Sequence, residues 1–271
     1  MKTLFRLYWI MWIMIILKLG GSVITNKGKQ CSFRQKTTSS LAKEIKKANK
    51  EIILVHGAGS FGHILAKQYK LNEGHLREDQ LKGFSITHAT VQKLNSLILK
   101  TLHDNNIPAV SIPPHSILRL NNHKLMQMDY NIFEEYINGN FVPVTFGDVV
   151  LDKKLGFSIC SGDLLVSALA EYFKPEKVVF VIDEDGLYTA NPKINKNAKF
   201  IDDVKLKDLE RLTTAADSHA DVTRGMGGKV DIIKNVARLG VDTVLLNGNK
   251  PGRLYRVLVG KDTKYTIVRG M

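Results

Sequence analysis

Residues 51–63 read EIILVHGAGSFGH, an apolar run followed by a loop that holds three glycines between His56 and His63. The run at 52–55 is typical of a buried strand, because its apolar side chains are continuous rather than alternating. Glycine has no side chain, so the backbone N–H groups of such a loop can closely approach an anion or another loop. The stretch therefore predicts a strand that ends in bare backbone, with the histidine at 63 just beyond it.

The same alternation of apolar runs and helical stretches extends along the rest of the chain. Strands are predicted at 15–19, 52–57, 108–112, 141–146, 178–183 and 242–248. Helices are predicted at 37–49, 80–106, 131–140, 162–173 and 227–240, several of them ending at Asn or Gly. This order predicts an α/β fold, an open and mostly parallel sheet with helices on both faces. Ligands of such folds bind at the carboxyl ends of the strands.

Length and composition limit the class of protein. A chain of 271 residues can form two lobes that share one sheet. Its 44% hydrophobic and 24% charged residues are ordinary globular values, which argue against disorder and against a membrane-embedded protein. Cys31 and Cys160 are far apart and belong to no Cys/His cluster, which argues against a disulfide scaffold and a structural zinc site. A reducing cytoplasm is the simplest location.

The net charge of +13 raises the question of nucleic-acid binding. The basic residues are spread thinly, and clusters such as KEIKKANK at 43–50 alternate with apolar positions as on a solvated helix face. We therefore expect no nucleic-acid partner. An anionic small-molecule substrate accounts for a positive field equally well.

Residues 1–13 precede the first predicted strand and include Lys2, Arg6 and an apolar run. The run resembles the start of a signal peptide, but no small-residue cleavage site follows, and it is short for a membrane span. We expect an extension that comes from an upstream start, with Met14 as the natural first residue, rather than a membrane anchor. No stable membrane insertion is expected.

Four further motifs accompany the loop at 56–63. They are KLGGS at 18–22, SGDLL at 161–165, VIDEDGLYTANPK at 181–193 and DVTRGMGGK at 221–229. Neither KLGGS nor HGAGSFGH matches the P-loop or the dinucleotide-binding pattern, and each alone would be explained by a tight turn. Because several of these motifs follow predicted strands, they are expected to meet at one edge of the sheet.

Together these motifs resemble the amino acid kinase family over residues 14–268, and VHGAGSFGH, ITNK and FGDVV resemble its isopentenyl phosphate kinases. The resemblance implies ATP and Mg²⁺ as cofactors and isopentenyl phosphate, or a similar prenyl monophosphate, as acceptor. It also implies isopentenyl diphosphate as product, a role in isoprenoid biosynthesis, and a homodimer. The acceptor would bind a lobe at 14–155 and ATP a lobe at 156–271.

The resemblance also implies roles for individual residues. The catalytic group would be Lys18, Lys27, His63, Asp163 and Lys229. ATP would contact Lys18, Leu19, Gly20, Gly21, Ser22, Gly59, Asp183, Gly225 and Lys229. The acceptor would contact Ala58, Gly62, His63, Gly147 and Gly162, and no protein ligand of a metal is expected. Ala58 and Arg224 stand where the family usually has glycine.

The chemistry of a phosphate acceptor agrees with these residue types. A phosphomonoester, whose second pKa is about 6, is already an anionic nucleophile at neutral pH and needs no general base. It does need cations and N–H donors, which the three lysines and His63 provide. Phe84, His88 and Val91 are expected to share the helix that lines the pocket for the acceptor's tail. A kinase for another small phosphate or phosphonate, such as fosfomycin kinase, and a catalytically silent nucleotide-binding protein remain alternatives.

Overall fold

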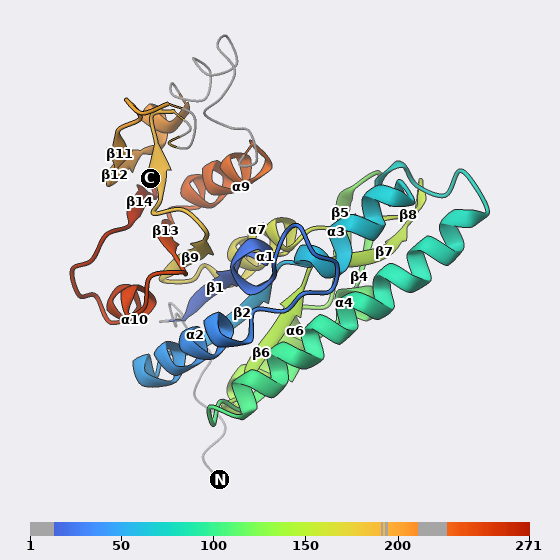
Figure 1. Ribbon diagram of the computed structural model, residues 1–271, viewed down its shortest axis with the longest axis horizontal. Helices are drawn as coiled ribbons and strands as arrows, with labels where there is room; N and C mark the ends of the chain where they lie inside the picture. The colour runs from blue at the N-terminus through green and yellow to red at the C-terminus, as the bar shows by residue number, and fades with distance from the viewer. Residues whose placement is uncertain (1–13, 191, 193–194, 211–226) are drawn as a thin grey trace.

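The computed structural model describes residues 14–190, 192, 195–210 and 227–271. It is built on a sheet of eight strands, and Figure 1 shows how the helices are arranged around that sheet. The strand order is β12-β14-β13-β9-β1-β2-β6-β3. These strands span Asp203–Lys205, Thr266–Arg269, Asp242–Asn247, Lys177–Ile182, Ile15–Leu19, Ile52–His56, Val142–Phe146 and Ala109–Ser111, in that order. The six strands from β13 to β3 are parallel, and β14 runs antiparallel to β13. All six lie where the sequence predicts strands, which confirms the open, mostly parallel sheet.

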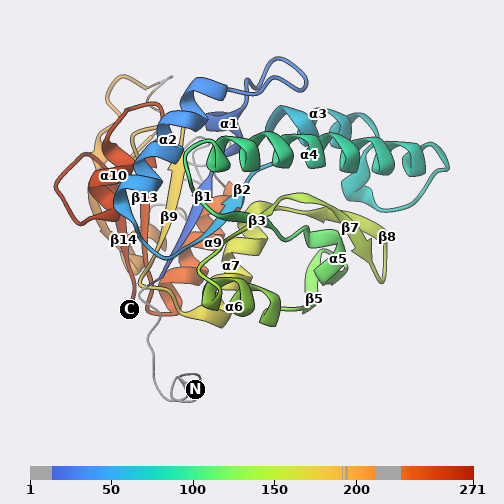
Figure 2. The ribbon, with the colours of Figure 1, turned by 90° about the horizontal axis from the view of Figure 1, so that it is seen from below.

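Helices cover both faces of the sheet, as Figure 2 shows. One face carries α1, α2, α3, α4 and α10, which span Gly21–Ile24, Gln35–Ala48, Gly59–Gln68, Asp79–His103 and Arg253–Leu258. The other carries α6, α7 and α9, which span Asn131–Asn138, Gly162–Phe173 and Gly227–Arg238. Strand β1 is buried on both faces: Ile15 and Leu17 face the first helical layer, and Ile16 faces the second. Lys18 therefore points toward α7 and α9, because side chains alternate along a strand.

A second sheet, which the sequence analysis did not predict, lies beside the first. Its order is β5-β4-β7-β8, and its strands span Lys124–Met128, Leu118–Asn121, Asp148–Asp152 and Gly156–Cys160. Shorter elements are the 3-10 helix Leu71–Glu73, helix α5 at Pro114–Ile117, and strands β10 at Leu187–Tyr188 and β11 at Phe200–Ile201. Strand β7 begins two residues after β6 ends, so the second sheet starts at the carboxyl edge of the first.

Residues 1–13 lie outside the described part of the chain. Within that part, every helix is too short or too polar to meet the requirements of a membrane span.

The loops after β1 and β2, which run into the first turns of α1 and α3, touch each other backbone to backbone. Leu19 pairs with His56 in the register of the two strands, and the Gly57 N–H donates to the Leu19 carbonyl at 3.0 Å. A Cβ atom on Gly57 would lie 2.8 Å from the Gly21 nitrogen, and one on Gly21 would lie 2.7 Å from the Gly59 Cα. Gly59 also has a φ of +50°, which favours glycine. The glycines are therefore required by the packing of the two loops, whatever they bind.

We expect Gly57→Ala to lower the free energy of unfolding by about 1–3 kcal/mol, because the added methyl group overpacks a backbone contact. Gly28→Ala is the matched control, since a Cβ at Gly28 meets no atom within 4 Å. The control should leave stability within about 0.5 kcal/mol of the wild type or raise it slightly. Urea denaturation monitored by circular dichroism measures both changes. Equal stability of the two variants would show that the loops have room to move apart.

Candidate active site

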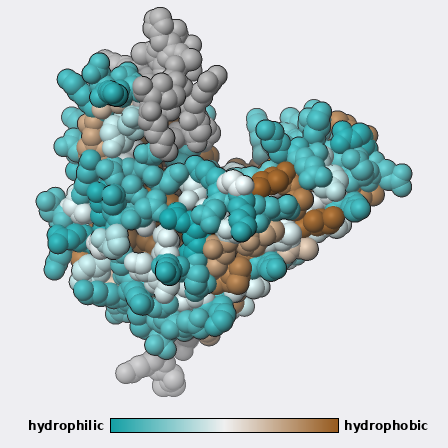
Figure 3. Space-filling model, viewed as in Figure 1, coloured by the Kyte–Doolittle hydropathy of each residue, from teal (hydrophilic) through white to brown (hydrophobic). Residues whose placement is uncertain are grey.

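A cavity of about 650 Å³ lies at the carboxyl ends of β1, β2 and β9. It falls in the range of small-molecule binding sites. The space-filling view shows the molecule hollowed between the arm that carries α3 and α4 and the part that carries β11 and β12 (Figure 3). Residues of α3 and α4 line one end of the cavity, and residues near β10, β11 and α9 line the other. The cavity therefore spans both halves of the chain.

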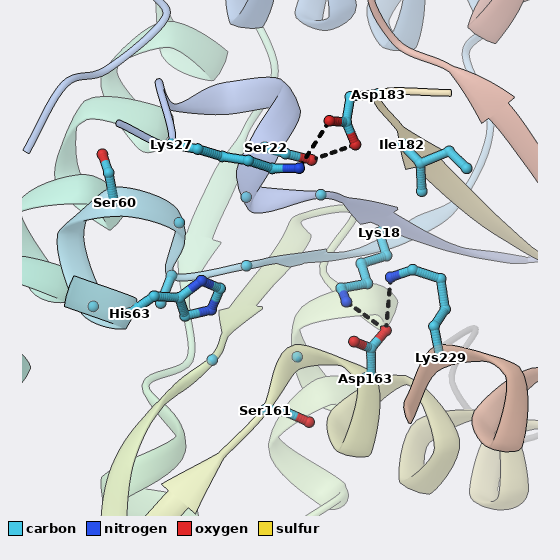
Figure 4. A pocket seen from close by; sticks show the side chains of 18 of the residues that line it. Lys18, Ser22, Lys27, Ser60, His63, Ser161, Asp163, Ile182, Asp183 and Lys229 are labelled. Carbon is cyan, nitrogen blue, oxygen red and sulfur yellow. Dashed lines mark hydrogen bonds and ion pairs between the residues drawn. The ribbon is translucent and has the colours of Figure 1, made fainter. Parts of the chain in front are cut away.

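Two lysines share one aspartate at the centre of the cavity (Figure 4). Asp163, in the first turn of α7, accepts a hydrogen bond from the Lys18 Nζ at 2.5 Å and one from the Lys229 Nζ at 3.4 Å, both through Oδ1. Both ammonium groups also lie over the ring of Phe180, 5.7 and 5.3 Å from its centroid. The three charged side chains come from β1, α7 and α9, so the cluster joins three elements that are distant in sequence.

Burial dominates the electrostatics of this cluster. Burial, and next the charge of Lys229, lower the pKa of Lys18 to about 8. Burial alone would raise the pKa of Asp163, but the charges of Lys18 and Lys229 outweigh it and hold that pKa below its usual value. Near neutral pH the trio therefore holds two cations and one anion. This positive surplus suits an anionic ligand.

A second lysine–aspartate pair lies across the cavity. Asp183, directly after β9, accepts hydrogen bonds from the Ser22 hydroxyl at 2.8 Å and from the Lys27 Nζ at 2.9 Å. Burial alone would raise the pKa of Asp183, but these two bonds lower it. The loop after β1 is thereby tied to the end of β9.

His63 projects from α3 into the open cavity (Figure 4). Burial of the ring against the cavity wall, and next the charge of Lys18, lower the pKa of His63. The ring is therefore neutral at neutral pH and has one N–H to donate. Within the described ranges it has no hydrogen-bond partner. His56 differs, because it is fully buried, lies 3.3 Å from the Asn95 Oδ1 and stacks on Phe146. These contacts give His56 a structural role in the core.

Several helices begin at the cavity wall and point their positive N-terminal ends toward it. Gly59 opens α3, Gly162 opens α7, and Lys229 lies in the first turn of α9. The Ser161 hydroxyl caps α7 by accepting the Leu164 N–H at 3.1 Å. Unpaired N–H groups and the helix dipole make such ends suited to anions. The dipole of α9 opposes the charge of Lys229, and Asp163 offsets that repulsion.

Most of the residues predicted from the sequence meet in this cavity. Its wall includes Lys18, Gly20, Gly21, Ser22, Lys27, Ala58, Gly59, Gly62, His63, Gly147, Gly162, Asp163, Asp183 and Lys229. The side chain of Leu19 instead packs in the core. Gly225 and Arg224 lie outside the described residues. Ala58 has a right-handed helical backbone, so alanine in place of glycine there carries no strain.

One end of the cavity is apolar, and it lies between α3, α4 and the second sheet. Its apolar lining includes Ala66, Val91, Val149 and Ile159. Of the three residues that the sequence placed there, Val91 lines the cavity, whereas Phe84 and His88 do not. Phe84 packs on Phe157, behind this wall, at a centroid distance of 5.2 Å. Helical spacing alone did not reveal which face of α4 points inward.

Sequence reasoning missed several lining residues, among them Ser60, Thr87, Asp148 and Ser161. Asp148 and Ser161 lie within the quoted motifs FGDVV and SGDLL, so their positions could have been read from these motifs. Thr87 lies one position before His88 on the predicted helix and carried no signal of its own.

Comparisons with known proteins agree with this geometry. The sequence model of the amino acid kinase family matches residues 14–247. The isopentenyl phosphate kinase of Methanothermobacter thermautotrophicus is 38% identical over 95% of this chain and 99% of its own length. That of Methanocaldococcus jannaschii is 36% identical over 92% of this chain and 96% of its own length.

Solved structures give the same result. A crystal structure of an isopentenyl phosphate kinase superposes with a TM-score of 0.84 at 35% identity, covering 94% of this chain and 99% of that one. The substrate complex of an isopentenyl phosphate kinase superposes with a TM-score of 0.81 at 30% identity, covering 95% and 100%.

We expect Asp163→Asn to lower the free energy of unfolding by about 2–3 kcal/mol at pH 7. The variant leaves the buried Lys18 and the partly buried Lys229 unpaired, but Lys18 limits the cost by releasing its proton. Because the wild-type pKa of Lys18 is about 8, the unfolded chain binds more protons than the folded protein between that value and 10.5. The contribution of Lys18 to stability thus rises with pH in this window. In the same window Lys18 loses its proton in the folded wild type, so its ion pair with Asp163 is lost. The difference in the free energy of unfolding between variant and wild type therefore shrinks as the pH rises.

Denaturation at pH 7 and pH 9 measures this difference. The double variant Lys18→Met with Asp163→Asn is the control, because it removes one cation with the anion and should be more stable than Asp163→Asn at pH 7. A double variant less stable than the single one would contradict the pairing.

Proposed function

This chain belongs to the amino acid kinase family, and from that premise we propose that it phosphorylates isopentenyl phosphate with ATP. The bond between the γ-phosphorus and the bridging oxygen of ATP breaks, and an oxygen of the acceptor phosphate forms a new bond to that phosphorus. The products are isopentenyl diphosphate and ADP. The relatives that match over nearly the whole chain bear the name of this activity.

The observation that carries the proposal is the pairing of the cavity's aspartates. Asp163 bonds two lysines, Asp183 bonds Lys27, and Asp148 bonds His88. A hydroxyl acceptor needs a carboxylate or similar base to remove its proton. A phosphate acceptor needs no base, because it is already an anion, and the excess of positive lysine charge in the cavity attracts it. The apolar end of the cavity matches a short hydrocarbon tail and is less suited to a polar phosphonate.

We propose the following roles for the polar side chains. Lys18 and Lys229 neutralise the phosphoryl group as it transfers, because charge spreads over its oxygens in the transition state. Lys27 and Ser22 hold the phosphates of ATP from the loop after β1. His63 donates its N–H to the acceptor phosphate, and Asp163 keeps the two central lysines in place.

The halves of the chain divide the two substrates in this proposal. The acceptor binds the lobe at 14–155, whose α3 and α4 line the apolar end of the cavity. ATP binds the lobe at 156–271, with the loop after β1 reaching across to its phosphates. Gly225 belongs to the nucleotide contacts by resemblance alone. A homodimer and a cytoplasmic location are part of the same proposal.

The residues present are compatible with Mg²⁺ carried by ATP. Magnesium prefers oxygen ligands and usually binds through substrate phosphates, water and one or two carboxylates. Asp163 and Asp183 are the carboxylates nearest to the lysines, and both already bond cations. The ion would therefore be held mainly by the phosphates, and when bound it would offset their charge.

A direct assay tests the function. The protein is incubated with Mg-ATP and each of isopentenyl phosphate, a ten-carbon prenyl phosphate, fosfomycin and glycerol 3-phosphate, and the phosphorylated products are measured. We expect the highest kcat/KM for isopentenyl phosphate. Highest activity on fosfomycin would favour the phosphonate kinase, and nucleotide binding without turnover would favour a silent protein.

We expect His63→Ala to lower kcat by about a hundredfold or more, because a donor to the reacting phosphate is lost. His63→Gln keeps a donor and should retain more activity. His123→Asn, on an exposed turn, controls for the loss of a histidine and should match the wild type. Steady-state kinetics with isopentenyl phosphate measure all three. Unchanged kcat in both His63 variants would exclude the proposed role.

The apolar end of the cavity should set the length of the acceptor's tail. Val91→Ala enlarges this end directly, and Phe84→Ala loosens the wall behind it, so both should raise the relative kcat/KM of a ten-carbon prenyl phosphate. Leu94→Ala is the matched control, because Leu94 is buried on the same helix but packs toward α2 and the sheet. It should lower stability without changing selectivity. Similar selectivity in all three variants would remove this end of the cavity from the acceptor site.

A further inference from the structure

A cluster of two histidines and one aspartate lies beside the acceptor end of the cavity. His88 comes from α4, His115 from α5 and Asp148 from the start of β7, and both helices pack against β7. The Asp148 side chain is fully buried, while those of His88 and His115 are 28% and 38% exposed. The cluster is thus anchored in the protein yet open to the surface through its imidazoles.

The polar atoms of the cluster converge on one carboxylate oxygen. The Nδ1 of His88 lies 2.8 Å from the Oδ2 of Asp148, and the Nδ1 of His115 lies 3.8 Å from the same oxygen. The two imidazoles meet edge to face at a centroid distance of 4.4 Å. One ligand atom from each residue lies within 4.8 Å of the others. Three potential ligands from three elements therefore surround one point.

Within the described residues, one buried nitrogen of this cluster has no hydrogen-bond partner. The Oδ1 of Asp148 accepts the Val149 N–H at 2.8 Å, so only Oδ2 serves the two imidazoles. His88 takes that position, and the Nδ1 of His115 is buried without a hydrogen-bond partner. A buried polar atom without a partner costs free energy and calls for an explanation, such as an ion.

We propose that His88, His115 and Asp148 bind a divalent transition-metal ion, for which Zn²⁺ is the probe. Zinc binds imidazole nitrogen at about 2.0–2.1 Å and carboxylate oxygen at about 2.0–2.2 Å. Two ligand atoms of a tetrahedral zinc ion at such distances lie about 3.4 Å apart. This separation falls between the 2.8 Å and 3.8 Å that join the Oδ2 of Asp148 to the Nδ1 atoms of His88 and His115. Three protein ligands leave a fourth position for water. Magnesium is a poor occupant, because it prefers oxygen ligands.

The site differs from the lysine centre in position and chemistry. It uses neither Asp163 nor Asp183. Its two imidazole nitrogens also differ from the oxygen ligands that a phosphate-bound Mg²⁺ prefers. An ion there would join α4, α5 and β7 at one point. Asp148 and Thr87, the neighbour of His88, line the cavity. The ion would therefore fix the wall beside the acceptor, which is a positioning role.

Metal binding can be measured without reference to kinase activity. The full chain is treated with chelator, dialysed against Zn²⁺ in excess Mg²⁺, and its bound zinc is determined by elemental analysis. We compare the wild type with His115→Ala and His88→Gln, each of which removes one ligand. His123→Asn is the matched control, because it removes an exposed histidine outside the cluster. Circular dichroism without metal establishes that each variant is folded.

We expect one zinc ion per chain in the wild type and in His123→Asn, and none in the other two variants. At free Zn²⁺ one hundred times the dissociation constant, the melting temperature of the wild type should rise by about 5 °C. Co²⁺ in place of zinc should give visible absorption that His115→Ala abolishes. Equal zinc binding by all four proteins, or none by the folded wild type, would overturn the site. Neither result bears on phosphorylation of isopentenyl phosphate.

Discussion

The pairing of Lys18 with Asp163 is the interaction on which the arrangement of this protein depends. Lys18 lies on the central strand β1 and is only 5% exposed, and a charge buried to that extent must be paired. Helix α7 must therefore begin close enough to the end of β1 to present its carboxylate. Because α9 packs on α7, Lys229 reaches the same oxygen. A single aspartate thus fixes how the two halves of the chain meet.

The burial of Lys18 also affects the charges that the cavity presents to an anionic ligand. Burial lowers the pKa of Lys18 to about 8, closer to neutral pH than that of an ordinary lysine. In the proposed function, a phosphate bound beside Lys18 would favour the charged form and so raise that pKa. Burial, and next the charge of Lys18, lower the pKa of His63, so its ring is neutral at neutral pH. The buried lysine thus contributes, after burial itself, to keeping His63 a neutral donor.

Local patterns in the sequence predicted the six parallel strands and most of the helices, because strands buried on both faces read as continuous apolar runs. The second sheet was missed, since β5 is mostly exposed and has no such run. The inward face of α4 was assigned wrongly at Phe84 and His88, because two of the buried positions in this part of the helix are Gly83 and Thr87, whose side chains gave no apolar signal. His88, His115 and Asp148 are distant in sequence, and only the tertiary fold brings them together.

The glycine loops explain why local sequence was ambiguous about the site. Gly21, Gly57 and Gly59 are needed for two loops to touch, so a turn accounts for them without any ligand. Yet that contact also brings the N-terminal end of α3 beside the loop after β1 and turns His63 toward Lys18. The turn and the anion site are thus consequences of one constraint. What distinguishes a binding site from a turn here is the set of charges around the loops, which lies elsewhere in the sequence.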